Sequence, residues 1–252
     1  MRSLWAAVHL LTGVPGPRPT RATPDQLVGS LLWFPVVGAG LGALLGFIEW
    51  GVRRVSGSSP LACGLAVTLG LAATGGRPLQ GLMVVSGALF AGRDPEGLVQ
   101  LAGRSVPTRF GVLVGLAAQL LKYALLLALP GQQRLGALVL ALGLARGGIV
   151  WALWRFPYAG IDMGIGEWFA AVAGVRDLPL VLPVVALGVG LLDPVSVLAA
   201  WAGTWLLVHG FSLWVSRMLS GLSAQACEAV AEVGELGGLA AVAGLGQALQ
   251  AL

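Results

Sequence analysis

The sequence predicts an all-α fold: a polytopic helical membrane protein with about six transmembrane spans, in a single integral membrane domain over residues 1–252. The chain is 57% hydrophobic and 10% charged, and its mean hydropathy is +0.87, whereas about a quarter of the residues of a soluble domain are charged. Its Leu, Ala, Val and Gly runs show no alternation of period two, which favours helices over barrel strands. At about 20 residues per span, the length accommodates about six helices.

The N-terminal segment, residues 1–26, begins with an apolar stretch that is too short to span a bilayer. A secretory signal peptide would end in a cleavage site of small residues, but Gly and Pro residues follow this stretch. We therefore expect an amphipathic helix that lies at the membrane interface, with Trp5 and His9 near the headgroups.

Apolar runs that predict the spans follow along the chain, at 27–50, 60–76, 110–130, 135–154, 178–192 and 195–215. Tryptophans lie near the ends of these runs, as an aromatic belt would place them: Trp50, Trp151, Trp154 and Trp214. The short connection at 193–194 predicts an antiparallel hairpin of the last two spans. Residues 79–92 are apolar but too few for a span, which predicts a re-entrant or interfacial helix.

The arginines outside these runs predict the orientation, because cytoplasmic loops of membrane proteins are enriched in Lys and Arg. With the N-terminus inside, ten arginines lie in inside segments and three lie outside, Arg53, Arg54 and Arg134. The 77–109 loop alone carries Arg77, Arg93, Arg104 and Arg109. We therefore expect a multi-pass protein of the cytoplasmic (inner) membrane, with both termini and the 77–109 loop in the cytoplasm.

The C-terminal helical segment, residues 221–252, carries three carboxylates on one predicted helix face. Glu228, Glu232 and Glu235 follow one another at i, i+4 and i+7, which are neighbouring positions on a helix surface. Two interpretations fit this spacing: a solvated face of a surface helix, or a polar strip that faces a cavity or binds a cation. The residues alone favour the surface helix.

Two basic residues fall inside predicted spans, where a charge is costly unless it faces protein, water or a partner. Lys122 lies in AAQLLKYALLL, and Arg146 lies in LGLARGGIVW. Both are therefore candidate site residues. The small neighbours of Arg146 let helices approach closely, which predicts that it is buried in the bundle. Lys122 is able to snorkel toward an interface.

The net charge of +4 does not indicate a nucleic-acid partner. The basic residues, nearly all of them Arg, are scattered without a basic stripe, which is typical of contacts with lipid headgroups or ligand phosphates. Cys63 and Cys227 fit no metal or redox spacing. The lipid bilayer is thus the one partner that composition predicts.

The order of motifs resembles that of the cobalamin synthase family (adenosylcobinamide-GDP ribazoletransferase). LLTGVPGP is similar to the family's F-x-T-R-x-P-x-P, and SLLWFPVVGAGLGALLG to S-x-x-x-F-P-L-V-G-x-x-I-G. TGGRPLQGLMVVSGALFAG is similar to T-G-G-x-H-L-D-G-L-A-D-x-x-D-G, and RSVPTRFG to D-S-R-x-G. LARGG, WRFPYAG, MGIGEWF and SGLSAQACEAVAEVGEL follow in the family's order. No single piece is specific, but their order and spacing over most of the chain are.

The resemblance implies a reaction and its partners. The family transfers a phosphocobinamide group from its GDP-activated form to the ribose hydroxyl of α-ribazole and releases GMP, at a late, membrane-bound step of cobalamin assembly. The reaction needs Mg²⁺, bound through an aspartate-rich motif, because attack on a phosphorus flanked by anionic oxygens requires charge neutralisation. The implied ligand is a corrinoid, or GDP-cobinamide itself.

The chain departs from the family at its charged positions. The family's histidine and aspartates fall on Pro78, Gln80, Val84, Gly87, Arg104 and Gln225. The frame is kept at Phe34-Pro35, Thr74-Gly75-Gly76, Gly81-Leu82, Arg146, Tyr158-Ala159, Glu232 and Glu235. Glutamine can offer an oxygen to a metal but cannot balance its charge. An ordinary Mg²⁺ site is therefore not expected, unless Glu232 with Glu235, or Asp94 with Glu96, holds the ion.

No residue is therefore assigned a catalytic role, and the weak substrate-binding candidates are Arg104, Arg109, Arg146, Tyr158, Glu232 and Glu235. Three functions stay open. The chain is a working ribazoletransferase with a relocated metal site; a non-catalytic homologue that binds a corrinoid, self-associates or partners a competent synthase; or a small transporter. Residue chemistry favours an impaired or non-catalytic family member, a pseudoenzyme, and the lack of an internal repeat disfavours the transporter.

Overall fold

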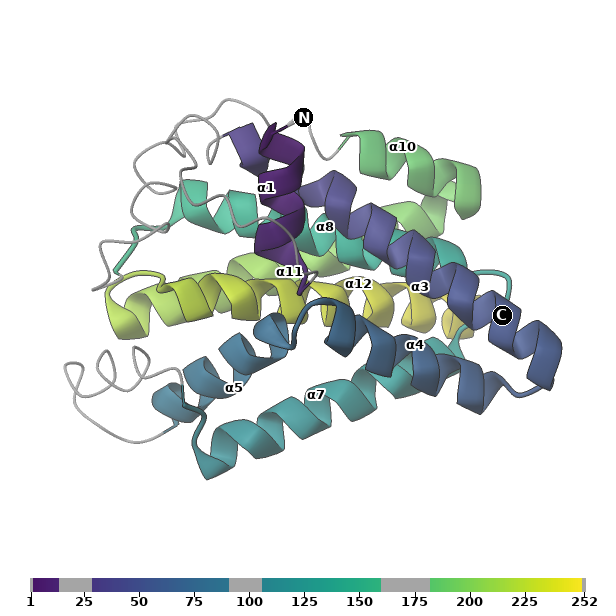
Figure 1. The fold of residues 1–252 in the computed structure, drawn as a ribbon, viewed down its shortest axis with the longest axis horizontal. Helices are drawn as coiled ribbons and strands as arrows, with labels where there is room; N and C mark the ends of the chain where they lie inside the picture. Colours follow the sequence, from purple (N-terminus) through teal and green to yellow (C-terminus); the bar gives the residue numbers. More distant parts are fainter. Residues whose placement is uncertain (1, 14–28, 91–105, 160–181, 251–252) are drawn as a thin grey trace.

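The computed structural model describes residues 2–13, 29–90, 106–159 and 182–250. Its regular elements within these ranges are helices, apart from one isolated bridge between Tyr158 and Leu222, which confirms the all-α prediction (Figure 1). The helices are α1 (Arg2–Leu11), α3 (Phe34–Ser56), α4 (Ser59–Ala73), α5 (Arg77–Leu89), α7 (Arg109–Ala128), α8 (Arg134–Arg155), α10 (Leu182–Leu191), α11 (Pro194–Leu219) and α12 (Ala224–Gln250).

The prediction of about six spans is confirmed by the lengths and composition of these helices. Five are long and apolar enough to cross a membrane: Gly29–Ser56, Arg109–Ala128, Arg134–Arg155, Pro194–Leu219 and Ala224–Gly246. The pair α4 and α5, which is bent by 83° at a short break, makes a sixth if it is counted as one span. The re-entrant or interfacial helix predicted at residues 79–92 corresponds to α5. For the run predicted at 178–192, the described part is the ten-residue α10.

The C-terminal segment is not a surface helix, and that prediction is wrong. Helix α12 runs through the middle of the bundle (Figure 1) and contacts α11, α8, α5 and α7. Its small residues permit this, because helices without bulky side chains approach closely in a membrane. A Cβ added to Gly203 of α11 would lie 2.5 Å from the Gly237 carbonyl oxygen of α12. The carboxylate face of α12 consequently lies inside the protein.

Helices α3 and α8 cross at an equally close glycine contact. Gly38 and Gly42 on one face of α3 lie against the backbone of α8, and a Cβ on Gly42 would lie 2.8 Å from the Cα atom of Val139. Gly40, on another face of α3, has nothing within 4 Å of that position. The glycines of α3 therefore have two roles, close packing and lipid-facing surface.

The break between α4 and α5 is made by the Thr74-Gly75-Gly76 segment. Gly75 and Gly76 have φ angles of +63° and +69°, a left-handed conformation that other residues adopt at a cost. Pro78 follows in the first turn of α5, where its missing N–H leaves no helical bond unmade. Two successive left-handed residues turn the chain, so that α5 leaves at a steep angle to α4.

Helix α1 is docked onto this break. The Arg77 guanidinium donates hydrogen bonds to the carbonyl oxygens of Leu10 at 2.8 Å and Thr12 at 3.0 Å. A cation at a helix C-terminus is favourable because unpaired carbonyls and the helix dipole meet there. The Gly13 N–H also donates to the Ala73 carbonyl oxygen, at 2.7 Å. A segment predicted to be interfacial is thus fixed to the frame of the bundle.

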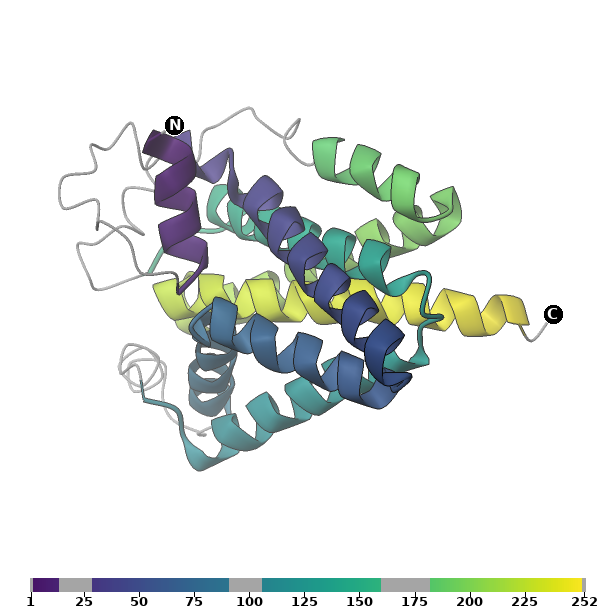
Figure 2. The ribbon, with the colours of Figure 1, turned by 45° about the vertical axis from the view of Figure 1, so that its right-hand side comes forward.

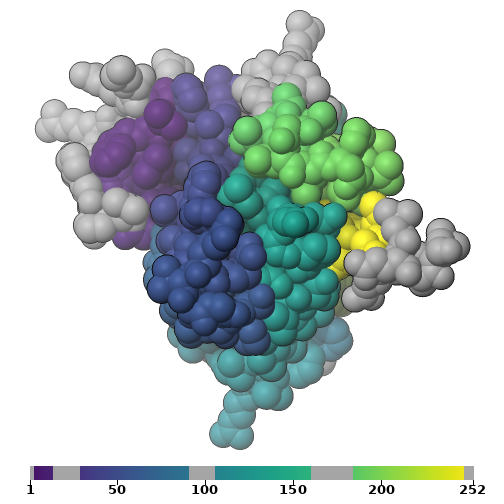
Figure 3. Space-filling view, turned by 90° about the vertical axis from the view of Figure 1, so that its right-hand side faces the viewer, coloured from purple at the N-terminus to yellow at the C-terminus, as the bar shows by residue number. Residues whose placement is uncertain are grey.

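The two ends of the chain lie at different ends of the bundle. In Figure 2, α1 and the start of α12 lie at one end, and the last turns of α12 lie at the other, where that helix extends past its neighbours. The prediction that both termini face the cytoplasm stays a prediction, and the C-terminal segment that follows the last predicted span is a central helix. The space-filling view in Figure 3 shows α10 lying over α8 on the outside of the bundle.

Candidate functional site

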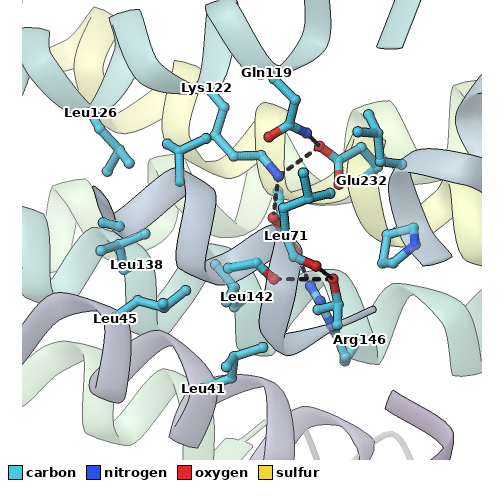
Figure 4. A pocket seen from close by; sticks show the side chains of 17 residues that line it. Leu41, Leu45, Leu71, Gln119, Lys122, Leu126, Leu138, Leu142, Arg146 and Glu232 are labelled. Carbon is cyan, nitrogen blue, oxygen red and sulfur yellow. Dashed lines mark hydrogen bonds and ion pairs between the residues drawn. The ribbon is translucent and has the colours of Figure 1, made fainter. Parts of the chain in front are cut away.

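Five polar side chains from α7, α8 and α12 form one chain of contacts inside the bundle (Figure 4). The Gln119 amide donates to Glu232 Oε1 at 2.7 Å. The Lys122 ammonium lies 2.6 Å from Glu232 Oε1 and 2.7 Å from Glu235 Oε2. The Arg146 guanidinium donates to Glu235 Oε1. We call these five residues the ion cluster.

The helical spacing of the residues accounts for the ion cluster. Gln119 and Lys122 are three residues apart on α7, and Glu232 and Glu235 are three residues apart on α12, so each pair shares a helix face. Because α7 and α12 contact one another, the two faces meet. Arg146 arrives from α8, in agreement with the predicted burial of this residue in the bundle.

The charges of the ion cluster cancel within a nearly dry interior. Lys122 is 8% exposed and Arg146 is 1% exposed, and Glu232 and Glu235 are 3% and 5% exposed. Two cations thus face two carboxylates, which a buried charge requires because an unpaired one is strongly destabilising. The expectation that Lys122 snorkels toward an interface is wrong, since both of its anionic partners lie inside the bundle.

A cavity of about 30 Å³ adjoins the ion cluster, which is room for about two water molecules. Thr74 and Pro78, at the break between α4 and α5, form part of its wall. Leucines of α3 and α8 form the apolar side (Figure 4): Leu41, Leu45, Leu138 and Leu142. The cavity is far too small for a nucleotide.

The positions that match the family's acidic motif lie on α5, and apolar packing has filled part of them. Val84 is 2% exposed. A Cβ on Gly87 would overlap the Thr108 hydroxyl. Gln80 is exposed, and its neighbour Gly81 packs against the first turn of α12, where a Cβ would lie 2.5 Å from the Gln225 carbonyl oxygen. Positions that the resemblance matches to acidic residues of the family, Gln80 and Gln225, therefore lie at or beside one crossing of α5 and α12.

The described residues do not fit a Mg²⁺ ion. Mg²⁺ prefers near-octahedral oxygen ligands, usually including carboxylates. Across the described ranges, no group of three or more His, Cys, Asp or Glu side chains could hold a metal. The carboxylates of Glu232 and Glu235 are already neutralised by Lys122 and Arg146. Asp94 and Glu96, the other predicted alternative, lie outside the described residues.

The remaining predicted substrate-binding residues do not join the ion cluster. Arg109 is the first residue of α7 and is exposed. Tyr158 pairs with Leu222 in the isolated bridge, in which the Leu222 N–H donates to the Pro157 carbonyl oxygen at 2.8 Å. Arg104 lies outside the described residues. Of the six candidates, the structure thus brings together Arg146, Glu232 and Glu235.

Sequence reasoning missed Gln119 and did not pair Lys122 with the carboxylates. The available signal was their spacing, because Gln119 lies three residues before Lys122 in an otherwise apolar helix. His209, in α11, stacks on Trp205 with ring centroids 5.2 Å apart. His9 packs edge-on against Trp5, also at 5.2 Å. Neither histidine lies in the ion cluster.

Comparison with known proteins gives one consistent result. A family described as cobalamin-5-phosphate synthase matches residues 3–243. The adenosylcobinamide-GDP ribazoletransferase of Desulfitobacterium hafniense (strain Y51) is 30% identical over 236 residues, which are 88% of this chain and 89% of that protein. The protein of the same name from Pseudomonas aeruginosa PAO1 is 34% identical over 73% of this chain and 74% of its own.

A third relative of that name, from Thermosynechococcus vestitus, is 35% identical over 63% of this chain and 64% of its own length. No solved structure matches the chain. The similarity to these relatives therefore rests on sequence.

Proposed function

The chain belongs to the cobalamin-5-phosphate synthase family, and from this premise we propose that it serves the membrane-bound step of cobalamin assembly with an impaired transferase activity. Its relatives are named adenosylcobinamide-GDP ribazoletransferases, and the reaction of such proteins releases GMP. Phosphoryl transfer depends on positioning and on neutralising charge at the reacting phosphate. The family neutralises this charge with Mg²⁺, and this chain lacks the matched carboxylates that would hold the ion.

The charge balance of the ion cluster is the observation that supports impairment most directly. Glu232 and Glu235 are the carboxylates kept from the family pattern in the described part of α12, and both are bound to cations of the chain itself. On α5, the matched aspartate positions are a glutamine, a buried valine and a glycine beneath Thr108. The retained frame thus keeps residues of the family pattern without the negative charge that would hold Mg²⁺.

Substrate recognition without turnover is the second candidate function. The kept frame, with the close crossing of α5 and α12 at Gly81, supports a protein that binds a corrinoid or GDP-cobinamide, or that associates with a competent synthase or with itself. Equilibrium binding of cobinamide by the purified chain, without GMP release, is the result expected for this function. No described feature favours a transporter.

We propose an orientation in which α1, together with the turn between α11 and α12, faces the cytoplasm at the inner membrane. Arg77, Arg109, Arg155 and Arg217 lie at or near the helix ends of this side, and the far end has three arginines, Arg53, Arg54 and Arg134. Residues 224–252 contain no Lys or Arg. A membrane crossing by α12 therefore leaves the number of arginines on each side unchanged. The C-terminus then faces the periplasm, and a C-terminal alkaline phosphatase fusion should be active.

The proposed impairment is tested by GMP release from GDP-cobinamide and α-ribazole in detergent, with and without Mg²⁺. The Desulfitobacterium hafniense relative is the positive control. We expect no Mg²⁺-stimulated release by this chain, and release at a rate close to that of the relative would refute the proposal.

A gain-of-function variant sharpens this test. Restoring aspartate at Gln80, Val84, Gly87 and Gln225 supplies four of the five matched carboxylates, all but the one at Arg104, and Thr108→Gly makes room for the side chain at position 87. Appearance of Mg²⁺-dependent GMP release in this variant would show that the lost activity follows from the replaced carboxylates. The matched control carries Asn at the same four positions, which retains the shape without the charge.

A further inference from the structure

We infer that an exposed surface shared by α5, α7 and α11 binds an anionic phospholipid, with the lipid phosphate at Arg109 and Arg217. The end of α5, the start of α7 and the end of α11 lie at one end of the bundle (Figure 1), the end proposed to face the cytoplasm. The surface shares no residue with the ion cluster, and lipid binding there requires neither turnover nor a corrinoid.

An aromatic patch, which we define as Phe90, Phe110 and Trp214, connects the three helices. Phe90 lies at the end of α5, and its ring centroid is 4.9 Å from that of Phe110 in α7 and 5.8 Å from that of Trp214 in α11. The three side chains are nevertheless 62%, 43% and 41% exposed. A contiguous exposed surface of large apolar side chains marks an interaction site, and Trp is enriched where lipid headgroups meet hydrocarbon.

An arginine lies beside this patch on each of the two long helices. Arg109 precedes Phe110 at the start of α7, and Arg217 lies about one turn beyond Trp214 near the end of α11. Both arginines are exposed, and neither forms an ion pair with another residue of the described ranges. A guanidinium without a carboxylate partner is suited to phosphate, because its planar fork of donors matches the phosphate oxygens.

The apolar face of α7 next to Arg109 has the depth of one membrane leaflet. Three leucines follow Arg109 at i+4, i+7 and i+11, which are positions on the same helix face: Leu113, Leu116 and Leu120. They are 64%, 55% and 68% exposed. The rise from Arg109 to Leu120 is about 16 Å, close to the roughly 15 Å of half the hydrocarbon core. An acyl chain whose headgroup lies at Arg109 therefore has apolar contacts along its length.

Helix α11 repeats this arrangement in the opposite chain direction. Trp214, Gly210 and Leu206 precede Arg217 by three, seven and eleven residues, which places them on one face with it. Leu206 is 64% exposed, and nothing lies within 4 Å of the position of a Cβ on Gly210. Each helix thus has an exposed apolar face that ends in an arginine, and the aromatic patch connects the two arginine ends. This arrangement fits a lipid with one phosphate and two acyl chains.

Charge complementarity favours an anionic phospholipid over the other occupants of such a surface. Phosphatidylglycerol brings a net negative charge to the two arginines, whereas the phosphate of phosphatidylcholine carries its own quaternary ammonium. A second copy of the chain docked through the same surface would add two further arginines. The residues that define the surface include no carboxylate to balance them.

Native mass spectrometry of the full-length chain, delipidated in detergent, measures the binding of dioleoyl phosphatidylglycerol and dioleoyl phosphatidylcholine. Arg109→Gln and Arg217→Gln should each weaken phosphatidylglycerol binding about fivefold, the factor that corresponds to about 1 kcal/mol per basic residue near an anionic surface. Phosphatidylcholine binding should stay unchanged. The matched control is Arg54→Gln, which removes an exposed arginine that lies over the Trp50 ring and should leave the binding of both lipids unchanged.

Equal binding of the two lipids by wild type would overturn the inference, as would losses in Arg109→Gln and Arg217→Gln no larger than that in Arg54→Gln. Glycerol phosphate carries the headgroup phosphate without acyl chains, and competition by it as strong as that by the lipid would assign the arginines to a soluble phosphate ligand instead. A wild-type dimer that dissociates in the two Gln variants would assign the surface to a second copy. Either result overturns the lipid site.

A second measurement keeps both arginines in place. Phosphatidylglycerol with brominated acyl chains quenches the fluorescence of tryptophans that it contacts. Trp214→Phe should remove part of the quenching that is specific to phosphatidylglycerol over phosphatidylcholine. Trp201→Phe, which replaces a similarly exposed tryptophan on another face of α11, should leave this difference unchanged. Equal effects of the two substitutions would overturn the inference.

Discussion

Replacing Glu235 with Gln should destabilise the protein strongly, because this carboxylate lies between both cations of the ion cluster. Its two oxygens contact Lys122 at 2.7 Å and the Arg146 guanidinium. In Glu235→Gln, Glu232 remains as the one carboxylate for two buried cations, so the cluster gains a net positive charge. The substituted amide has nearly the same volume, and the effect therefore reports charge rather than packing.

The expected magnitude follows from the burial of these groups. Removing one partner of a buried ion pair costs about 3–5 kcal/mol, since the charge left behind is uncompensated. Lys122 and Arg146 are 8% and 1% exposed, and the few waters that the adjoining cavity of about 30 Å³ admits carry no charge to balance these cations. We expect a loss of about 3 kcal/mol or more in the free energy of unfolding.

Reversible unfolding in mixed micelles of dodecyl maltoside and SDS measures this loss. Glu228→Gln is the control on the same helix, because Glu228 is only partly buried and should cost under about 1 kcal/mol. The double variant Glu235→Gln with Lys122→Met restores neutrality and should be more stable than Glu235→Gln alone. A loss under about 1 kcal/mol for Glu235→Gln, or strict additivity in the double variant, would refute the charge argument.

Three further changes test other parts of the structure. Gly42→Ala should lower the thermal unfolding midpoint because its Cβ meets the α8 backbone, and Gly40→Ala, where nothing lies within 4 Å, should leave it unchanged. Arg77→Ala removes the bonds that hold the end of α1, so limited proteolysis should release the N-terminal segment faster than in wild type. Asp193 caps α11 through Ser196, and these hydrogen bonds lower its pKa. Asp193→Ala should cost about 1 kcal/mol at neutral pH, a difference that disappears as the pH falls through the lowered pKa of the folded state. Equal stability of wild type and Asp193→Ala at pH 7 would contradict the proposed contribution of this helix cap.

The sequence was sufficient for conclusions that depend on local chemistry. Helical spans followed from long apolar runs, because backbone groups in hydrocarbon must be paired within the segment. The burial of Arg146 followed from the small residues beside it, and the separate helix α5 from an apolar stretch too short to span. The missing aspartates of the family motif were also visible at once, since a motif is read residue by residue.

The conclusions that failed depended on distant partners. The carboxylates of α12 contact side chains of α7 that lie 113 residues away in the sequence, and Arg146 lies 89 residues from Glu235. With three glutamates on one face and no cation nearby in the chain, a solvated surface was the simpler interpretation. The predicted position of Lys122 was made without these partners in view, and it was wrong.

The sequence by itself therefore determined a helical membrane protein of the family and the loss of that family's acidic positions. The tertiary structure alone decided where the remaining charges go. It placed α12 at the centre of the bundle, where Lys122 and Arg146 neutralise Glu232 and Glu235. The physical reason is that hydropathy is a property of each segment, whereas the partner of a buried charge is set by which helices pack together.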